Sequence, residues 1–361
     1  MTIVNLFDSL NVLLCDINAN IMWKQTFTII IILLSGHLAI AQNLGERTLN
    51  FKDESRNNRP VVTEIWYPTA DTLKPADKHF SPFLRQPTVR NGKLPANILP
   101  LILLSHGTGG GRLTLEWLAQ AIANSGCIVA AVDHYGNTYD HKIPLEFVKP
   151  WERPLDISFA LTSLLNNPEI GPLINQQKIG ATGFSFGGYT MIALAGAKLD
   201  FEQARNYYKT TGRKELEIPE FPGLVKLLDD SSMIADSKHV PPLKDNRIKA
   251  FFSISPALGF GFTRKEQVAD IKGALYIVGS QSDSIAPVKT NARHYHQLIG
   301  RSKYTELPGK VGHYVMLGEA IDAVKKEAPI YFTDDPSVNR HAIHLQVDSL
   351  AVGFFKTALK Y

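Results

Sequence analysis

Short apolar runs alternate with amphipathic stretches along most of the chain. The apolar runs are rich in β-branched residues, which is typical of strands buried on both faces of a parallel sheet. They occupy Leu101–Leu104, Ile128–Val132, Lys178–Phe184, Ile248–Ile254, Ala274–Val278 and Tyr304–Leu307. The amphipathic stretches predict helices over Arg112–Asn124, Pro154–Leu165, Ser185–Ala197, Lys265–Ile271, Val288–Ile299 and Ala342–Leu359.

Two further strands are expected before this series. Arg47–Lys52 and Val61–Tyr67 alternate in the manner of an antiparallel pair, and the polar segment 53–60 between them is a turn region. A long polar connection then runs from Pro68 to Asn97. The whole pattern predicts an α/β fold, with a mostly parallel eight-stranded sheet flanked by helices on both faces.

The strand–helix alternation breaks between Lys198 and Arg247. This segment is charged, contains prolines and shows no strong apolar helical face. Because this segment directly follows the expected helix 185–197, we predict that 198–247 is a cap-like insertion that covers a site at the start of that helix.

The first 41 residues differ from the rest. Lys24 precedes the apolar run Thr26–Ala41, which ends in Ala39-Ile40-Ala41. A basic start, a short apolar centre and an Ala-x-Ala end predict a secretory signal peptide at 22–41, cut after Ala41. Residues 1–21 are then interpreted as a mis-called start, with Met22 as the true one. A buried segment and an uncleaved membrane anchor are the alternatives, although the apolar centre is short for a span.

With the signal peptide removed, we expect a secreted or periplasmic protein whose residues 42–361 form one domain. Composition then excludes several classes of partner and site. The net charge of +4, from 38 basic and 34 acidic residues, is too balanced for a nucleic-acid partner. The two cysteines, Cys15 and Cys127, exclude a disulfide scaffold and a Cys-rich metal site.

A Gly-x-Ser-x-Gly sequence carries the first chemical signal. Gly183 and Gly187 flank Ser185, after an apolar strand and before a helical run. In this context the serine lies on a sharp turn, and side chains at the two glycine positions would collide across it. We therefore predict that Ser185 is a nucleophile and that the glycines form its elbow. A tight turn without catalysis is the alternative.

A serine hydroxyl needs a base, and the base needs an orienting acid. Asp283 directly follows the expected strand 274–278, and His313 lies in the loop after the strand 304–307. The chain order serine, acid, histidine matches the order in α/β-hydrolases. We predict that Asp283 and His313 complete a catalytic triad with Ser185. A helix-capping role is the alternative for Asp283.

A glycine-rich loop, Ser105–Gly111, follows the strand 101–104. Its glycines free the backbone to point amides inward, as an oxyanion hole requires. We predict that the backbone N–H groups of Thr108 and Phe186 are the two donors. A phosphate loop is the alternative, but the Gly-Lys-Ser/Thr ending is missing.

These motifs together resemble the α/β-hydrolase superfamily over roughly residues 46–359. Within it, the chain resembles predicted dienelactone hydrolases and platelet-activating-factor acetylhydrolase-like esterases. The resemblance rests on Leu104–Gly107, Val132–His134, Trp151–Asp156, Gly183–Tyr189 with its Phe-flanked serine, Asp283 and Gly312–Tyr314.

The resemblance implies hydrolysis of carboxylic esters through an acyl-enzyme, without a metal or another cofactor. Short-chain esters, phospholipid acyl esters and lactones are the expected substrates. True dienelactone hydrolases use a cysteine nucleophile, so the serine favours a general esterase. The alternatives are a cutinase-like polyesterase, an acyltransferase or peptidase with the same triad, and a non-catalytic binding protein. A small-molecule or polymeric ester is the only expected partner.

Overall fold

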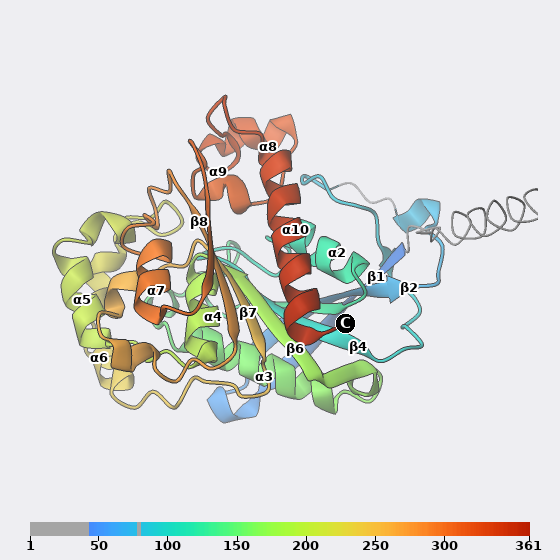
Figure 1. Ribbon diagram of the computed structural model, residues 1–361, viewed down its shortest axis with the longest axis horizontal. Helices are drawn as coiled ribbons and strands as arrows, with labels where there is room; N and C mark the ends of the chain where they lie inside the picture. The colour runs from blue at the N-terminus through green and yellow to red at the C-terminus, as the bar shows by residue number, and fades with distance from the viewer. Residues whose placement is uncertain (1–42, 78–80) are drawn as a thin grey trace, which may run out of the picture. The chain divides into compact units, whose positions relative to one another are not determined.

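The computed structural model describes residues 43–77 and 81–361 (Figure 1). The segments 1–21 and 22–41, which we interpret as a mis-called start and a signal peptide, lie outside the described residues. Within the described ranges, no helix is long and apolar enough to cross a membrane.

Nine strands form one sheet in the described part of the chain, in the order β3-β1-β2-β5-β4-β6-β7-β8-β9. They are β1 (Asn43–Asp53), β2 (Arg59–Thr69), β3 (Val89–Arg90), β4 (Leu99–Ser105), β5 (Ile128–Val132), β6 (Ile174–Phe184), β7 (Ala250–Ile254), β8 (Ala274–Ser280) and β9 (Lys303–Leu307). Only β2 runs antiparallel to its neighbours β1 and β5. The expected eight strands are all present, and the two-residue strand β3 extends the edge beside β1.

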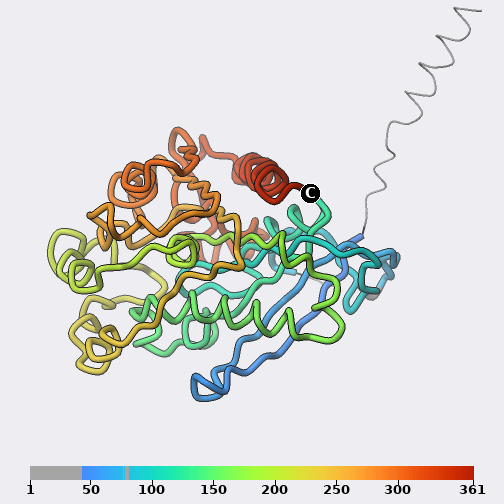
Figure 2. The backbone as a smooth tube through the Cα atoms, turned by 60° about the horizontal axis from the view of Figure 1, so that its bottom comes forward, coloured from blue at the N-terminus to red at the C-terminus, as the bar shows by residue number. Residues whose placement is uncertain are grey.

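Helices cover both faces of the sheet. α3 (Glu152–Asn166), α4 (Phe186–Ala195) and α7 (Ala292–Ile299) share one hydrophobic cluster with the sheet. α2 (Glu116–Asn124) and α10 (Arg340–Leu359) share the other. Figure 2 shows the red C-terminal helix α10 and the green helix α3 on opposite sides of the strands. The predicted mostly parallel α/β fold is therefore confirmed.

Three predicted helices begin late or are shorter than expected. α2 begins at Glu116 rather than Arg112, because residues 112–115 form turns in which the Arg112 N–H donates to Asp133 Oδ1. The helix expected from Val288 begins at Ala292. The stretch predicted over 265–271 is only a 3₁₀ turn, η8, because its short apolar pattern does not sustain a longer helix.

Several short elements, with the exception of η8, have no counterpart in the sequence predictions. The insertion 198–247 contains α5 (Phe201–Lys209) and α6 (Ser231–Ser237), and α8 (Asp322–Glu327) and α9 (Pro329–Phe332) precede α10. The 3₁₀ helices are η1 (Glu54–Arg56), η2 (Pro75–Asp77), η3 (Pro144–Phe147), η4 (Gly171–Leu173), η5 (Arg213–Leu216), η6 (Leu224–Asp229), η7 (Gly259–Gly261), η8 (Lys265–Val268) and η9 (Tyr314–Met316).

The insertion has an apolar side that its sequence does not reveal. Tyr208, Leu224 and Met233 are buried in a third hydrophobic cluster with Phe147 and Trp151. These residues come from several short elements, so no single helix carries a periodic apolar face. Within the fold, α5 packs against η7, which follows β7.

Candidate active site

The predicted nucleophile lies where β6 turns into α4. Ser185 has φ 58° and ψ −116°, a strained conformation for a residue with a side chain. A Cβ at Gly187 would clash with the Ser105 carbonyl oxygen, and a Cβ at Gly183 would clash with the Gly187 carbonyl oxygen. The turn therefore needs both glycines, Gly183 because of the predicted collision across the turn and Gly187 because it lies against the end of β4.

The structure brings the three predicted triad residues together. The His313 Nε2 atom lies 2.9 Å from Ser185 Oγ, and His313 Nδ1 lies 2.6 Å from Asp283 Oδ2. Asp283 follows β8, and His313 precedes η9 in the loop after β9. All three side chains are nearly buried, with Ser185 6% exposed. We name these residues the pocket triad.

Backbone amides hold the Asp283 carboxylate in place. Its Oδ1 accepts hydrogen bonds from the Ile285 N–H at 2.9 Å and the Ala286 N–H at 2.7 Å. No helix begins here, since α7 starts only at Ala292, so these bonds form a turn and not the helix cap given as the alternative. With Nδ1–H donating to this acid, the His313 Nε2 lone pair faces the serine hydroxyl and can accept its proton.

The glycine-rich loop passes directly beside the serine. A Cβ at Gly107 would lie 3.4 Å from the Ser185 Cβ, and Thr108 and Phe186 line the same pocket as Ser185 and His313. Phe186 is the first residue of α4, so its N–H has no intrahelical acceptor. Thr108 and Phe186, which carry the two predicted oxyanion donors, thus lie in the pocket with Ser185.

A second Ser–His–Asp arrangement lies beneath the loop. Ser105 Oγ is 2.9 Å from His134 Nε2, and His134 Nδ1 is 2.9 Å from Asp156 Oδ2. All three side chains are fully buried. We name these residues the buried network. Its order of donors and acceptors repeats that of the pocket triad, but no substrate can reach Ser105.

Two arginines neutralise the acid of the buried network. Arg59 forms two hydrogen bonds with the Asp156 carboxylate, at 2.8 and 3.2 Å, and Arg56 Nη1 lies 2.8 Å from it. These contacts and the bond from His134 outweigh burial and hold the pKa of Asp156 well below its usual range. Burial lowers the pKa of His134 to about 4, so this imidazole is neutral at physiological pH.

A third arginine supports the loop itself. Arg153 on α3 donates from Nη1 to the His106 carbonyl at 2.5 Å and from Nη2 to the Gly107 carbonyl at 3.1 Å. Its Nη2 also donates to Asn137 Oδ1 at 2.9 Å, and the same oxygen accepts the Gly109 N–H at 2.9 Å. Side chains from α3 and from the loop after β5 therefore fix the backbone that carries the oxyanion donors.

Local sequence patterns do not predict this supporting set. Arg153 and Asp156 contribute to the family resemblance only within Trp151–Asp156, and His134 only within Val132–His134. The available signal was a cluster of charged residues on an otherwise buried helix. Arg153 and Asp156 are three residues apart on α3 and therefore lie on one face.

The pocket above Ser185 is mainly apolar. Side chains from η3, from the insertion, from the loops after β7 and β8 and from the residue after η9 line it with the triad, including Phe147, Tyr208, Leu216, Ile218, Leu224, Leu258, Ile285 and Leu317. Two acidic residues, Glu215 and Glu220, also line it, but no lysine or arginine does among the described residues. This lining favours neutral, largely apolar groups over anions.

One acidic side chain in the pocket has few partners. Glu220 Oε2 and the Tyr314 hydroxyl are both buried without a well-formed hydrogen bond among the described residues, although the two groups lie close enough for each to shift the pKa of the other. Burial raises the pKa of Glu220. Glu215 differs, because Tyr207, Thr290 and Asn291 donate to its carboxylate. Glu220 is therefore the less fully engaged of the two acids in the pocket.

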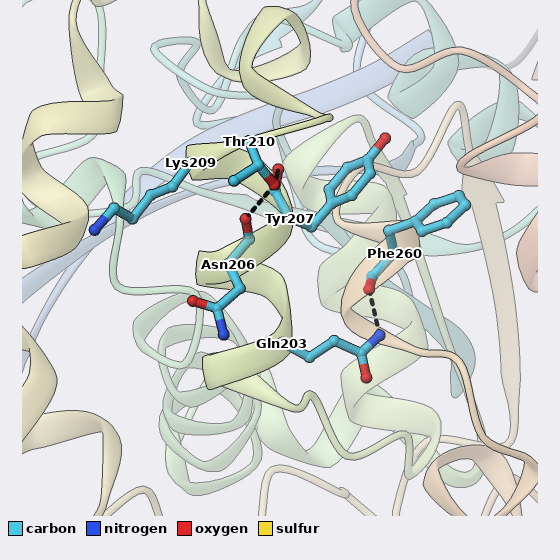
Figure 3. A pocket seen from close by; sticks show the side chains of 6 residues that line it. All are labelled: Gln203, Asn206, Tyr207, Lys209, Thr210 and Phe260. Carbon is cyan, nitrogen blue, oxygen red and sulfur yellow. Dashed lines mark hydrogen bonds between the residues drawn. The ribbon is translucent and has the colours of Figure 1, made fainter.

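A second hollow lies on the insertion, away from the triad (Figure 3). It is lined by Gln203, Asn206, Tyr207, Lys209, Thr210 and Phe260, none of which lines the pocket at Ser185. Tyr207 and Phe260 stack on each other with their ring centroids 4.7 Å apart. The Gln203 side chain donates to the Phe260 carbonyl. This hollow contains no group arranged for catalysis.

Metal and thiol chemistry have no evident place in the described ranges. No group of three or more His, Cys, Asp or Glu residues is placed there to hold a metal ion. Cys127 is buried beside β5, and burial raises the pKa of its thiol to about 11. This thiol is therefore protonated and inert at neutral pH.

Comparisons with known proteins identify the fold. No protein-family model and no curated protein sequence match the chain. Many solved structures do, including a ferulic acid esterase from Streptomyces cinnamoneus. This match has a TM-score of 0.56 and 18% sequence identity, and it covers 90% of this chain and 92% of the other. The narrower resemblance to dienelactone hydrolase-like esterases remains an expectation. The chain has the α/β-hydrolase fold.

Proposed function

We propose that this protein is a serine ester hydrolase that acts on carboxylic esters through an acyl-enzyme. The observation that carries the proposal is the geometry at Ser185. A strained serine faces a pocket, its hydroxyl lies 2.9 Å from an imidazole, and a carboxylate orients that imidazole. The solved esterase that shares the fold supports the same class of reaction.

Each residue has one role in this reaction. Ser185 Oγ attacks the acyl carbonyl carbon while His313 Nε2 takes the hydroxyl proton. The N–H groups of Thr108 and Phe186 donate to the resulting oxyanion. His313 then gives the proton to the leaving alcohol, which leaves an acyl group on Ser185. Water, activated by the same imidazole, releases the acid, and Asp283 stabilises the imidazolium that forms in both steps.

The pocket favours neutral esters. Its apolar lining suits a short acyl chain or an aryl group, and its two glutamates disfavour a nearby anion. We propose short-chain esters and lactones ahead of phospholipids, within the dienelactone hydrolase-like and acetylhydrolase-like branch. Cutinase-like action on polyesters, and transfer or peptide cleavage by the same triad, are outcomes for the substrate test.

Active-site labelling tests the class of enzyme. A fluorophosphonate probe should label the wild-type protein on Ser185, as identified by mass spectrometry, and the Ser185→Ala variant should not be labelled. Labelling that survives in this variant, or no labelling of the folded wild-type protein, would contradict the proposal.

Substrate analysis then tests the narrower assignment. A series of p-nitrophenyl esters of increasing acyl length, extended to lactones and polyester particles, would define the preferred class. A product formed with an added alcohol or amine in preference to water would instead reveal an acyltransferase.

We also propose that the protein is exported. The support is the basic, apolar and Ala-x-Ala pattern at 22–41. N-terminal sequencing of the protein from the host's extracellular or periplasmic fraction should begin at Gln42. A cytosolic protein that retains residues 22–41 would contradict this.

A further inference from the structure

Arg153 lies directly behind the oxyanion loop and is only 1% exposed. Its guanidinium forms no ion pair in the described part of the chain. All its hydrogen bonds go to neutral oxygens, namely two loop carbonyls and the Asn137 side chain. Its Nε has no partner there either. A buried cation of this kind is unfavourable for folding, so stability alone does not explain it.

The neighbouring arginines provide a contrast. Arg59 and Arg56 lie close to Arg153 in the fold, and both are paired with the Asp156 carboxylate. Burial lowers the pKa of Arg153 to about 9, whereas the carboxylates around Arg59 raise its pKa. The fold thus neutralises two of three adjacent cations and leaves the third facing the loop.

The hydrogen bonds of Arg153 act on the first oxyanion donor. The Gly107 carbonyl that accepts Nη2 belongs to the same peptide group as the Thr108 N–H. This peptide bond is trans, so its N–H points away from Arg153. His106 Nδ1 also donates to the Gly107 carbonyl, at 2.6 Å. The Gly110 N–H donates to the same carbonyl at 3.2 Å, and these three donors fix the plane of the peptide group and polarise its N–H.

The same cation also contacts the residue that carries the second donor. The guanidinium carbon of Arg153 lies 4.5 Å from the centroid of the Phe186 ring. Phe186 follows the nucleophile and is the first residue of α4. One buried positive charge therefore contacts both the Gly107–Thr108 peptide group and the side chain of the residue that carries the second predicted donor.

We propose that Arg153 is a positioning residue for the oxyanion hole, an inference that rests on the proposed function. It orients the Gly107–Thr108 peptide group through two loop carbonyls, and its charge favours the oxyanion over the neutral ester. The residue touches no substrate. Its effect should therefore appear in the transition state and not in ester binding.

Asn137 extends the same support. Its Oδ1 joins Arg153 to the Gly109 N–H, and its Nδ2 donates to the Glu146 carbonyl at 3.0 Å. The residues on both sides of Thr108 are thus held from behind. Loss of Asn137 should loosen one end of the peptide group while the charge of Arg153 remains.

Three variants separate the charge of Arg153 from its hydrogen bonds. Arg153→Lys retains the charge without the forked geometry, Arg153→Gln retains donors without the charge, and Asn137→Ala removes the second support. We expect kcat for p-nitrophenyl acetate to fall about 100-fold in Arg153→Gln and about 10-fold in the other two, with KM within two-fold.

Thionoesters give a readout that simple destabilisation would not change. A thiono sulfur is larger than oxygen and accepts hydrogen bonds weakly, so a well-set oxyanion hole prefers the oxoester. The ratio of oxoester to thionoester kcat/KM should fall in all three variants, most in Arg153→Gln. If a variant does not fold, as judged by circular dichroism, the other two still test the proposal.

Arg56→Gln is the matched control. It also removes a guanidinium from this charged cluster, but from the end that contacts Asp53, Glu152 and Asp156 and not the loop. It should reduce stability while leaving kcat and the thionoester ratio unchanged. Equal kcat losses in Arg56→Gln and Arg153→Gln, or an unchanged thionoester ratio in Arg153→Gln, would overturn the proposal.

Labelling rates keep this inference separate from the proposed function. If the wild-type protein reacts with a fluorophosphonate at Ser185 but hydrolyses no ester, the proposed function fails. The phosphoryl oxygen still occupies the oxyanion hole in that reaction, so slower labelling of Arg153→Gln would support the positioning role. An unchanged labelling rate would contradict it.

Discussion

The pocket triad and the buried network use the same three residue types in the same hydrogen-bonding order. Both have a serine 2.9 Å from the histidine Nε2 and an acid on Nδ1. Both serines lie at the carboxyl end of a central strand, one after β6 and one on β4. The order of donors and acceptors therefore does not by itself make a catalytic site.

Backbone geometry and access distinguish the two. Ser185 has a positive φ and lines a pocket, whereas Ser105 belongs to a strand and is completely buried. The strained turn holds the Ser185 hydroxyl at the N-terminus of α4, where backbone amides can donate hydrogen bonds to an oxyanion. Ser105 has no such space above it.

The groups that surround Asp283 and Asp156 also distinguish the pocket triad from the buried network. Asp283 accepts two backbone amides and leaves its other oxygen to His313. Asp156 is paired with two arginines that neutralise it fully. The first arrangement stabilises an imidazolium that forms during a reaction, and the second stabilises a fixed structure. Four predictions test this difference, from the largest expected effect to the smallest.

Replacing the two serines should give the largest contrast. Ser185→Ala should lower kcat for p-nitrophenyl acetate by at least about 10⁴-fold, because the nucleophile is lost. Ser105→Ala should leave kcat within about three-fold, because only a supporting hydrogen bond is removed. Steady-state kinetics and fluorophosphonate labelling check both. A large loss of labelling in a folded Ser105→Ala variant would contradict the division of roles.

Replacing the two acids should separate catalysis from stability. Asp283→Asn should lower kcat by about 10⁴-fold with little change in the free energy of unfolding, because His313 loses its orienting acid. Asp156→Asn should reduce the free energy of unfolding by about 3–5 kcal/mol, because it leaves Arg56 and Arg59 without a buried partner. Urea unfolding and kinetics on both variants measure the two effects. A large loss of stability in Asp283→Asn together with a large loss of kcat in Asp156→Asn would contradict the division of roles.

Acid should weaken the buried network before it protonates Asp156. The folded-state pKa of His134 is about 4, below the ordinary 6.5, so the unfolded state binds more protons between these values. Stability should therefore fall as pH drops from about 6.5 to 4, by up to about 3 kcal/mol from this group. Urea midpoints of wild type and His134→Gln measured across this range should show a flatter curve for the variant.

Other buried groups set the background of that measurement. His344, whose pKa burial also lowers to about 4, adds the same trend to both proteins. The slope difference between the two curves is therefore the quantity of interest. Parallel curves would mean that His134 does not contribute to the acid sensitivity.

The smallest expected effect concerns the charge above the pocket triad. Glu220→Gln removes the less engaged of the two acids from the pocket that contains Ser185. The ratio of kcat/KM for an anionic ester to that for a neutral ester of equal length should rise about three- to ten-fold, because a repulsion is lost. Glu215→Gln serves as a control, since bonds from three residues already engage that acid. Equal ratios in wild type and Glu220→Gln would contradict the role.

Local patterns predicted much of this molecule. Alternating apolar runs indicate the eight long strands, and the Gly-x-Ser-x-Gly spacing places Ser185 on a turn after β6. Asp283 and His313 follow from their positions after two later strands, because parallel strands place their carboxyl ends at one edge of the sheet. Such patterns depend on a few consecutive residues, so they can be recognised without knowledge of the fold.

Other features depend on residues that are distant in the sequence. Arg153 meets the loop 46 residues earlier in the chain, and Ser105 meets His134 29 residues later. The insertion builds its apolar side from short elements that show no periodicity. Nothing within a local window specifies these contacts, so pattern analysis places the residues without giving their roles.

The sequence by itself determined the α/β architecture, the elbow at Ser185 and the order of the acid and base that follow it, because strand periodicity and turn sterics are local properties. Only the tertiary structure decided which of two Ser–His–Asp sets faces a pocket and which is enclosed. It alone also left one buried arginine without a carboxylate behind the oxyanion loop. Burial, access and charge pairing are sums over contacts between remote segments, and they exist only once the chain has folded.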